Sequence, residues 1–208
     1  MSQPKLSILT PVWNQEELVI KTMDSIPRRD DIEVLVCDDG STDNTLKNLR
    51  EYAEKTDLPM VVMANEHNLG VAATANRLLR TATGEWFHFL MSDDYVYTDK
   101  YAGLIDSLYE TDADIVAMDL IINSGEEYVL CPEKDEWYCA QACRFIKREL
   151  VKGITYPEEK RVGEDWFFHK DMMKRNPKVF YSKVPAYHYN YPRRGSLVNL
   201  RLRGLIQP

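Results

Sequence analysis

Two adjacent carboxylates, Asp93 and Asp94, follow directly on the strongly apolar residues 86–91 (WFHFLM). A segment this apolar predicts a buried strand, and unpaired charges inside a core cost several kcal/mol each. We therefore expect both carboxylates at the rim of a site, just beyond the carboxyl end of the strand. Oxygen ligands on rigid backbone suit Mg²⁺ or Mn²⁺, and such an ion would in turn hold a substrate phosphate. The first hypothesis is a divalent ion with a diphosphate.

The size and charge of the chain exclude several classes of protein. A chain of 208 residues fits one large domain, or a domain with a small appendage, and a core of that size needs no disulfides. The formal net charge of -7 argues against nucleic-acid binding, which requires a basic face. The N-terminus lacks the features of a signal peptide, and no apolar run approaches ~18 residues. These observations predict a cytoplasmic protein.

The cysteines carry no predicted chemistry. Their spacing fits neither a CxxC pair nor a zinc site, so free thiols packed as small hydrophobic groups are the favoured interpretation. The four are Cys37, Cys131, Cys139 and Cys143.

The first half of the chain alternates β-rich runs with helical patterns. The predicted strands are residues 6–12, 32–37, 60–64 and 86–91. Between them lie helical patterns over residues 15–25, around Leu46, Leu49 and Ala53, and over 70–81. Strands separated by helices predict a mostly parallel sheet with helices on both faces.

The second half has a mixed pattern. We expect helices over residues 100–110, 139–151 and 165–174, and strands at 115–118, 179–181 and 186–189. Residues 120–131 favour two paired strands around a turn at 123–125. With no long linker or internal repeat, two halves of one domain are favoured over two domains.

Polar clusters follow three of the predicted strands, at residues 11–16, 38–43 and 92–95. In parallel sheets, ligands bind beyond the carboxyl ends of the strands. The three clusters therefore converge on one rim, although each alone would be read as a turn or a helix cap.

Six segments together resemble the GT-A fold glycosyltransferases of family 2, which use nucleotide sugars. They are LTPVWN at residues 9–14, VCDDGSTD at 36–43, HNLGVAATAN at 67–76, LMSDD at 90–94, VGEDW at 162–166 and YHYNYPRRGSL at 187–197. The resemblance implies a Rossmann-like α/β sheet, mostly parallel and flanked by helices, with a small mixed acceptor-side half. It divides one domain, 1–208, into a nucleotide-sugar half (1–98), an acceptor half (99–192) and a lid or tail (193–208).

The resemblance also implies a nucleotide site, with a UDP-linked sugar as the expected donor. Trp13 would stack on the base, and Asp39 would accept a hydrogen bond from it. Ala75 stands where relatives usually have Arg. The implied nucleotide-binding residues are Pro11, Trp13, Asn14, Glu16, Asp39, Asn68, Gly70, Asn76, Ser92 and Asp93.

For the metal, Mn²⁺ or Mg²⁺, the resemblance implies Asp94 as a ligand, with His188 close by. Met91 stands where many relatives have a further Asp. A lone His in a strand is also often a hydrogen-bonded packing residue. Arg193, Arg194 and Ser196 would face the diphosphate from a mobile lid.

Asp165 corresponds to the general base of inverting family members, which accepts the proton of the attacking hydroxyl. The resemblance places the preceding Glu164 at the acceptor site as well, although both acidic residues would also favour a helix N-terminus. Trp137 and Trp166 are candidate sugar platforms, although a buried core Trp is expected for one of them. Residues 137–150 resemble a segment that ends in a helix beside the acceptor, and a covering helix is the equal alternative.

The sequence therefore predicts a metal-dependent inverting glycosyltransferase that acts on a hydroxyl of a glycan, a lipid-linked saccharide or a protein. One alternative is a non-catalytic nucleotide-sugar or glycan-binding module. Another is a sugar nucleotidyltransferase, which is disfavoured because residues 11–16 contain no Gly, Lys or Arg. The basic and apolar residues 199–206 suggest a peripheral membrane or partner-protein contact.

Overall fold

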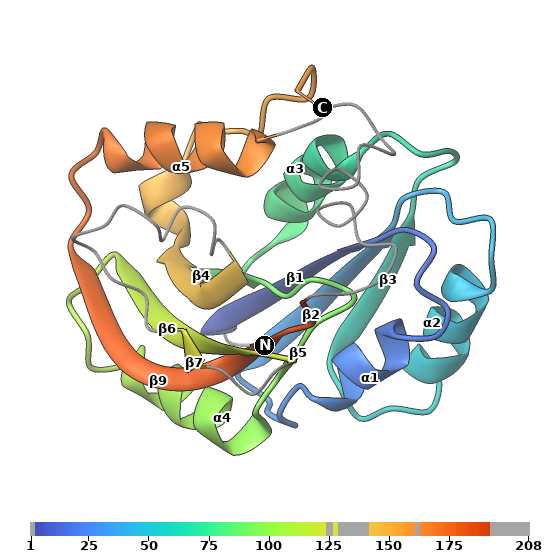
Figure 1. Ribbon diagram of the computed structural model, residues 1–208, viewed down its shortest axis with the longest axis horizontal. Coiled ribbons are helices and arrows are strands. Elements are labelled where there is room, and N and C mark those ends of the chain that lie inside the picture. The colour runs from blue at the N-terminus through green and yellow to red at the C-terminus, as the bar shows by residue number, and fades with distance from the viewer. Residues whose placement is uncertain (1–2, 124–126, 129–141, 161–162, 192–208) are drawn as a thin grey trace.

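The computed structural model describes residues 3–123, 127–128, 142–160 and 163–191. Its strands form a nine-stranded sheet in the order β3-β2-β1-β4-β8-β6-β9-β5, with β7 paired to β6. The sheet curls across the molecule between two layers of helices (Figure 1). The strands are β1 (Leu6–Val12), β2 (Ile32–Asp38), β3 (Met60–Ala64), β4 (Trp86–Phe89), β5 (Tyr95–Val96), β6 (Ile115–Ile122), β7 (Glu127–Tyr128), β8 (Arg144–Lys147) and β9 (Val179–Tyr189).

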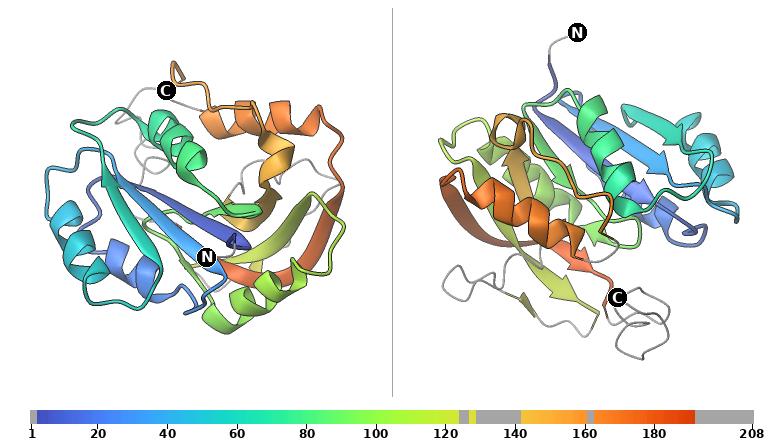
Figure 2. Two further views of the ribbon diagram at one scale, coloured as in Figure 1. Left: turned by 180° about the vertical axis from the view of Figure 1, so that it is seen from behind. Right: turned by 90° about the horizontal axis from the view of Figure 1, so that it is seen from above.

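The helices cover both faces of the sheet, as Figure 2 shows from behind and from above. They are α1 (Val19–Asp24), α2 (Thr45–Ala53), α3 (Val71–Thr81), α4 (Thr98–Ser107), the 3₁₀ helix η3 (Arg148–Val151) and α5 (Glu164–Met173). Alternate strand residues point to opposite faces. Ile8 therefore packs in the core cluster that includes α1, α2 and α4, while Leu9 packs in the cluster that includes α3 and α5.

The predicted parallel half of the sheet is confirmed. β1 pairs in parallel with β2 and with β4, and β2 pairs in parallel with β3. Val12 lies opposite Asp38, so the segments that follow β1 and β2 begin at the same edge of the sheet. All seven residues of β1 are buried, including the polar Ser7 and Thr10, as expected for a strand that is covered on both faces.

The helix expected over residues 139–151 is wrong for the residues that the structure describes. Arg144–Lys147 form strand β8, which lies antiparallel between β4 and β6, and η3 follows it. Because β8 is central, Arg144, Phe145 and Ile146 are all buried. A strand buried on both faces loses its alternating pattern and resembles a buried helix in sequence.

Two further boundaries differ from expectation. The two late strands are one continuous strand, β9, with irregular pairing to β6 near Asp119. Helix α1 begins at Val19 and not at Gln15; residues 16–18 form a turn in which the N–H groups of Leu18 and Val19 both donate to the carbonyl of Gln15. The expected strand pair is confirmed by β6 and β7, with Leu120 opposite Tyr128.

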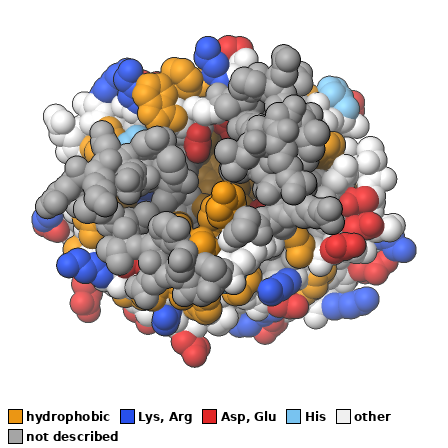
Figure 3. Space-filling model, viewed as in Figure 1, with side chains coloured by type: hydrophobic (Ala, Val, Ile, Leu, Met, Phe, Trp, Pro, Cys, Tyr) orange, Lys and Arg blue, Asp and Glu red, His pale blue; other side chains and the backbone are white. Residues whose placement is uncertain are grey.

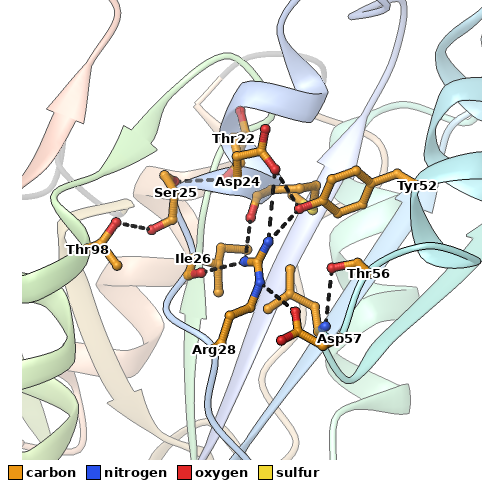
Figure 4. A network of polar contacts seen from close by, with 11 residues as sticks. Thr22, Asp24, Ser25, Ile26, Arg28, Tyr52, Thr56, Asp57 and Thr98 are labelled. Carbon is orange, nitrogen blue, oxygen red and sulfur yellow. Dashed lines mark hydrogen bonds and ion pairs between the residues drawn. The ribbon is translucent and has the colours of Figure 1, made fainter.

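A polar network ties the segment after α1 to α2 (Figure 4). The guanidinium of Arg28 donates to Asp57 Oδ1 at 2.9 Å, to Tyr52 Oη at 2.8 Å and to the carbonyl of Ile26 at 2.7 Å. Tyr52 in turn donates to Asp24 at 2.8 Å. These contacts fix α1 against α2 and so fix the loop that precedes α1.

Among the described residues, no helix combines the length and apolar character needed to cross a bilayer.

Candidate active site

Side chains bind the loops after β1 and β2 to each other. The backbone N–H of Asn14 donates to Ser41 Oγ, and Asn14 Oδ1 accepts from the N–H of Thr42, both at 2.9 Å. Glu16 Oε2 accepts from the backbone and side-chain nitrogens of Asn44 at 2.9 and 2.8 Å. Asn14 and Glu16 therefore hold the rim together, and their contact with a nucleotide stays a prediction.

Trp13 lies at the end of β1, where 49% of its surface is exposed. Pro11, two residues earlier, is buried within the strand. A half-exposed aromatic ring at this edge of the sheet is suited to stacking on a base. The structure thus agrees with the predicted position of Trp13, while its ligand remains a prediction.

Asp39 is buried and is the centre of a hydrogen-bond network beyond β2. Its Oδ1 accepts from the N–H of Leu69 at 2.9 Å and from Asn65 Nδ2 at 2.8 Å, and its Oδ2 accepts from the N–H of Gly70 at 2.9 Å. An ionised carboxylate has about four lone-pair sites, so Asp39 retains capacity for one further donor. It fixes the segment before α3, and its predicted bond to a base would be the fourth.

Two glycines bring these loops together. Gly40 has a φ of +67°, and a Cβ there would lie 2.5 Å from the carbonyl carbon of His67. Gly70, the residue before α3, has a φ of +92°, a backbone conformation that strains any residue with a side chain. Asn68, between them, is exposed at the rim.

Asn76 is buried on α3 and is bound to the segment after η3. Its Nδ2 donates to the carbonyl of Tyr156 and to Glu158 Oε1, both at 2.9 Å, and its Oδ1 accepts from the N–H of Tyr156 at 2.8 Å. The observed role of Asn76 is to join the two halves of the domain. Its predicted contact with a nucleotide is not tested by these bonds.

Asp94 is 2% exposed and strongly hydrogen-bonded. Its Oδ2 accepts from Tyr187 Oη at 2.6 Å and its Oδ1 from the N–H of Asn190 at 2.8 Å. Burial, with a smaller effect of Asp94, raises the pKa of Tyr187 well above its ordinary value, so Tyr187 is a neutral donor. Ser92, also buried, accepts at its carbonyl from Thr22 Oγ1 at 3.0 Å. The end of β9 therefore positions Asp94.

His188 faces a cavity of about 310 Å³ whose lining includes Asp93 and Asp94. Its ring stacks on Tyr95 with centroids 4.1 Å apart, Nδ1 lies 3.0 Å from Tyr97 Oη, and Nε2 lies 2.9 Å from Asn123 Oδ1. Burial, together with the charge of Lys21, lowers the pKa of His188. The structure thus brings together the three residues predicted near the metal.

Mg²⁺ usually binds through one or two carboxylates, with phosphates and waters completing its shell. Asp93 and Asp94 fit this pattern, because they place two consecutive carboxylates at the lining of one cavity. In the part of the chain that the structure describes, no group of three or more His, Cys, Asp or Glu residues is arranged around an ion position. A site here would therefore need oxygen atoms from the substrate.

Glu164 and Asp165 are half-buried in the first turn of α5, where carboxylates interact favourably with the helix dipole. Asp165 Oδ1 accepts from the N–H of Trp166 at 2.8 Å. Gly163 enters the helix in the left-handed conformation, with a φ of +73°. The predicted base is thus held on a rigid element, and 38% of the surface of the following Trp166 is exposed.

Arg144 is a buried cation on β8 beneath α5. It is 1% exposed, and its Nη1 donates to Nδ1 of His169 at 2.9 Å. Burial lowers the pKa of Arg144 to about 10, and the nearby Tyr156 and Asp165 partly oppose this effect. Sequence reasoning missed this buried cation, because Arg144 lies in a segment interpreted as a helix.

Both carboxylates with predicted reaction roles act electrostatically on the start of β8. Asp94 contributes to the raised pKa of buried Cys143, which burial mainly causes, and Asp165 acts on the adjacent Arg144. Asp94 and Asp165 therefore each act on one of the two consecutive residues Cys143 and Arg144. Figure 3, viewed as in Figure 1, shows acidic and hydrophobic side chains near the centre of the face that it presents.

Several predicted site residues fall outside the described residues. These are Trp137, Arg193, Arg194 and Ser196, together with the tail at 199–206. The described cysteines, Cys37 and Cys143, are buried free thiols. Sequence reasoning missed the supporting residues, whose partners are far away in the chain; these are Asn65, Arg144, Tyr187 and Asn190.

The comparison with known families agrees with this arrangement. Residues 7–174 match the family described as Glycosyl transferase family 2. The chain therefore belongs to glycosyltransferase family 2, as the sequence motifs predict.

Similar proteins include enzymes named for wall-polymer synthesis. A poly(ribitol-phosphate) beta-glucosyltransferase of Bacillus spizizenii is 26% identical over 92% of this chain and 33% of its own length. The poly(ribitol-phosphate) beta-N-acetylglucosaminyltransferase TarS of Staphylococcus aureus is 25% identical over 92% of this chain and 36% of its own. This chain thus spans about a third of the length of these relatives.

The structure of S. aureus TarS 1-349 in complex with UDP-GlcNAc superposes with a TM-score of 0.79. It is 25% identical to this chain, and the match covers 94% of this chain and 60% of that one. The predicted GT-A fold is confirmed by this similarity.

Proposed function

We propose that the protein is a metal-dependent, inverting glycosyltransferase that uses a UDP-linked sugar. The observation that carries the proposal is the position of Asp93 and Asp94 beyond β4, at the same sheet edge as Trp13 and Asp39. The similar TarS structure contains UDP-GlcNAc, which supports a uridine nucleotide as the donor. Trp13 would stack on the base, and Asp39 would accept its hydrogen bond.

Asp165 is the proposed general base. As the acceptor oxygen bonds to the anomeric carbon, its proton passes to the Asp165 carboxylate, and the bond from that carbon to the diphosphate oxygen breaks on the opposite side. Attack opposite the leaving group inverts the configuration. A divalent ion held by Asp94 and Asp93 would stabilise the charge on the departing diphosphate.

The acceptor is a hydroxyl group on a glycan or polyol chain, with lipid-linked saccharides and proteins as the further classes to test. Two similar proteins are named for poly(ribitol-phosphate), so a phosphodiester-linked polyol is the first acceptor to test. UDP-glucose and UDP-N-acetylglucosamine are the first donors, for the same reason.

Replacement of Asp165 by Asn tests the proposal directly. Loss of a positioned general base lowers turnover by about 10² to 10⁴-fold, while UDP affinity should stay within about threefold, less than 1 kcal/mol. Sugar transfer to poly(ribitol phosphate) and UDP titration calorimetry measure the two effects.

The matched control is Asp171→Asn, the same change on the exposed face of α5, where Asp171 contacts Lys174 at 2.6 Å. Equal turnover in both variants would contradict the role of Asp165. Binding of UDP without transfer by the unmodified protein would instead indicate a non-catalytic binding module.

A further inference from the structure

Two aromatic rings and two lysines form an exposed cluster on and beside the first turns of α5. Trp166 and Phe167 are each 38% exposed, and their rings meet edge to face with centroids 4.9 Å apart. Lys170 Nζ lies 5.0 Å from the centroid of Trp166, and Lys160 Nζ lies 5.4 Å from that of Phe167. We call these four residues the α5 aromatic–lysine patch.

The patch is not needed to attach α5 to the sheet. The opposite side of the helix provides Phe168 and Met172, both fully buried in the core. Phe168 also stacks on Tyr156, with centroids 4.2 Å apart. Trp166 and Phe167 therefore expose aromatic surface that packing does not explain, and such surface commonly marks a binding site.

The patch is cationic in a protein whose net charge is -7. Among the described residues, Lys160 and Lys170 make no ion pair with a carboxylate, whereas neighbouring Asp171 is paired with Lys174 at 2.6 Å. The ammonium groups of Lys160 and Lys170 instead lie over aromatic rings, where their charge remains available to an anion. This arrangement favours a ligand with negative charges and apolar C–H surfaces.

The patch adjoins the proposed base, because Asp165, Trp166 and Phe167 are consecutive residues at the start of α5. A polymer that presents one hydroxyl to Asp165 can therefore extend over the adjacent Trp166 and Phe167. In Figure 3, hydrophobic side chains with Lys or Arg side chains beside them lie at the top of the molecule, where Figure 1 places α5.

We infer that the α5 aromatic–lysine patch binds the phosphodiester chain of the acceptor next to the hydroxyl that reacts. This inference rests on the proposed function. The lysines would contact the phosphates, and the aromatic rings would contact the C–H faces of the polyol or sugar units. A membrane surface is the less favoured occupant, since α5 has only ten residues and this patch exposes only two large apolar side chains.

The test compares Lys160→Gln/Lys170→Gln and Trp166→Ala/Phe167→Ala with a matched control, Lys47→Gln/Lys55→Gln. The control removes the same charge on and just after α2, which lies far from α5 in Figure 1. Binding of poly(ribitol phosphate) is measured for each protein at several salt concentrations, with UDP binding measured in parallel.

Both patch variants should bind the polymer at least tenfold more weakly, while UDP affinity and the control variant stay unchanged. The lysine variant should also show a weaker dependence of polymer affinity on salt, because fewer counterions are released. Unchanged polymer binding by the patch variants, or no polymer binding by a protein that binds UDP, would overturn the inference. Binding to phosphatidylglycerol vesicles in place of the polymer would also overturn it. A protein that binds no UDP would refute the proposed function itself.

Discussion

Individual residues of the site are positioned by partners from distant parts of the chain. Asp94 is held by Tyr187 and Asn190, which lie 93 and 96 residues further along. Asp39 is held by the segment before α3, about 30 residues away. The carboxylates are thus preorganised by donors before any substrate binds.

Tyr187→Phe tests this support. The change removes the hydroxyl that donates to Asp94 Oδ2 at 2.6 Å. Loss of a hydrogen bond to a metal-ligating side chain commonly weakens metal affinity by about 10 to 100-fold. Titration of Mn²⁺ in the presence of UDP measures the change.

The matched control is Tyr109→Phe, which likewise removes a hydroxyl that donates to a carboxylate, Asp31 Oδ2 at 2.8 Å, beside the amino end of β2. We expect little change in Mn²⁺ affinity for this variant. If both variants bind Mn²⁺ as the unmodified protein does, the hydrogen bond from Tyr187 does not support a metal site.

The sequence identified the carboxylates but not their partners. Asp39, Asp93, Asp94 and Asp165 stand in short motifs, so local sequence was enough to select them. Tyr187 was visible only as one aromatic residue in an aromatic strand. Its role depends on strand pairing that brings residue 187 to residue 94, and local sequence does not specify that pairing.

At the scale of elements, one buried amide connects the two halves of the domain. Asn76 on α3 makes three hydrogen bonds with Tyr156 and Glu158, and Tyr156 stacks on Phe168 of α5. This connection contributes to the position of α5 and therefore of Asp165.

Asn76→Ala should destabilise the protein by about 3 kcal/mol, because buried backbone groups of Tyr156 lose their partners at about 1 to 3 kcal/mol each. Urea unfolding measures the free energy. Hydrogen exchange should also show faster exchange of α5 amides.

Asn48→Ala is the control, since Asn48 makes one exposed hydrogen bond, to the carbonyl of Glu16 at 3.2 Å. We expect its effect to stay below about 1 kcal/mol. An equal loss of stability in the two variants would show that Asn76 does not connect the halves.

Prediction of elements succeeded where pattern and burial agree. β1 to β4 and their helices follow the expected alternation, because each helix buries one side and exposes the other. β8 was missed since it is buried on both faces between β4 and β6, which removes the alternating pattern. Its place in the sheet arises from long-range pairing and not from local preference.

At the scale of the whole molecule, the strand order was not predictable from the sequence. β8 and β9 come late in the chain, yet β8 lies beside β4 and β9 beside β6.

A buried histidine lies at the centre of this arrangement. His88 on β4 contacts Tyr101 Oη through Nδ1 at 2.6 Å, and its Nε2 faces the carbonyl of Ala142.

His88 should make stability depend on pH. Because a carbonyl only accepts, Nε2 carries a proton, and Nδ1 accepts from the Tyr101 hydroxyl when the ring is neutral. Burial lowers the pKa of His88 from 6.5 to about 4. Between these pH values the unfolded chain binds a proton that the native protein does not, so the unfolding free energy falls as pH falls.

The loss attributable to His88 approaches about 3 kcal/mol at pH 4, at 1.36 kcal/mol for each pH unit. Urea unfolding from pH 7 to 4 measures it. His88→Gln should be less stable at pH 7 but should lose less stability on acidification, whereas His67→Gln, at an exposed position, should follow the unmodified protein. If His88→Gln keeps the full pH dependence, the titration comes from other groups and the buried ring does not control acid stability.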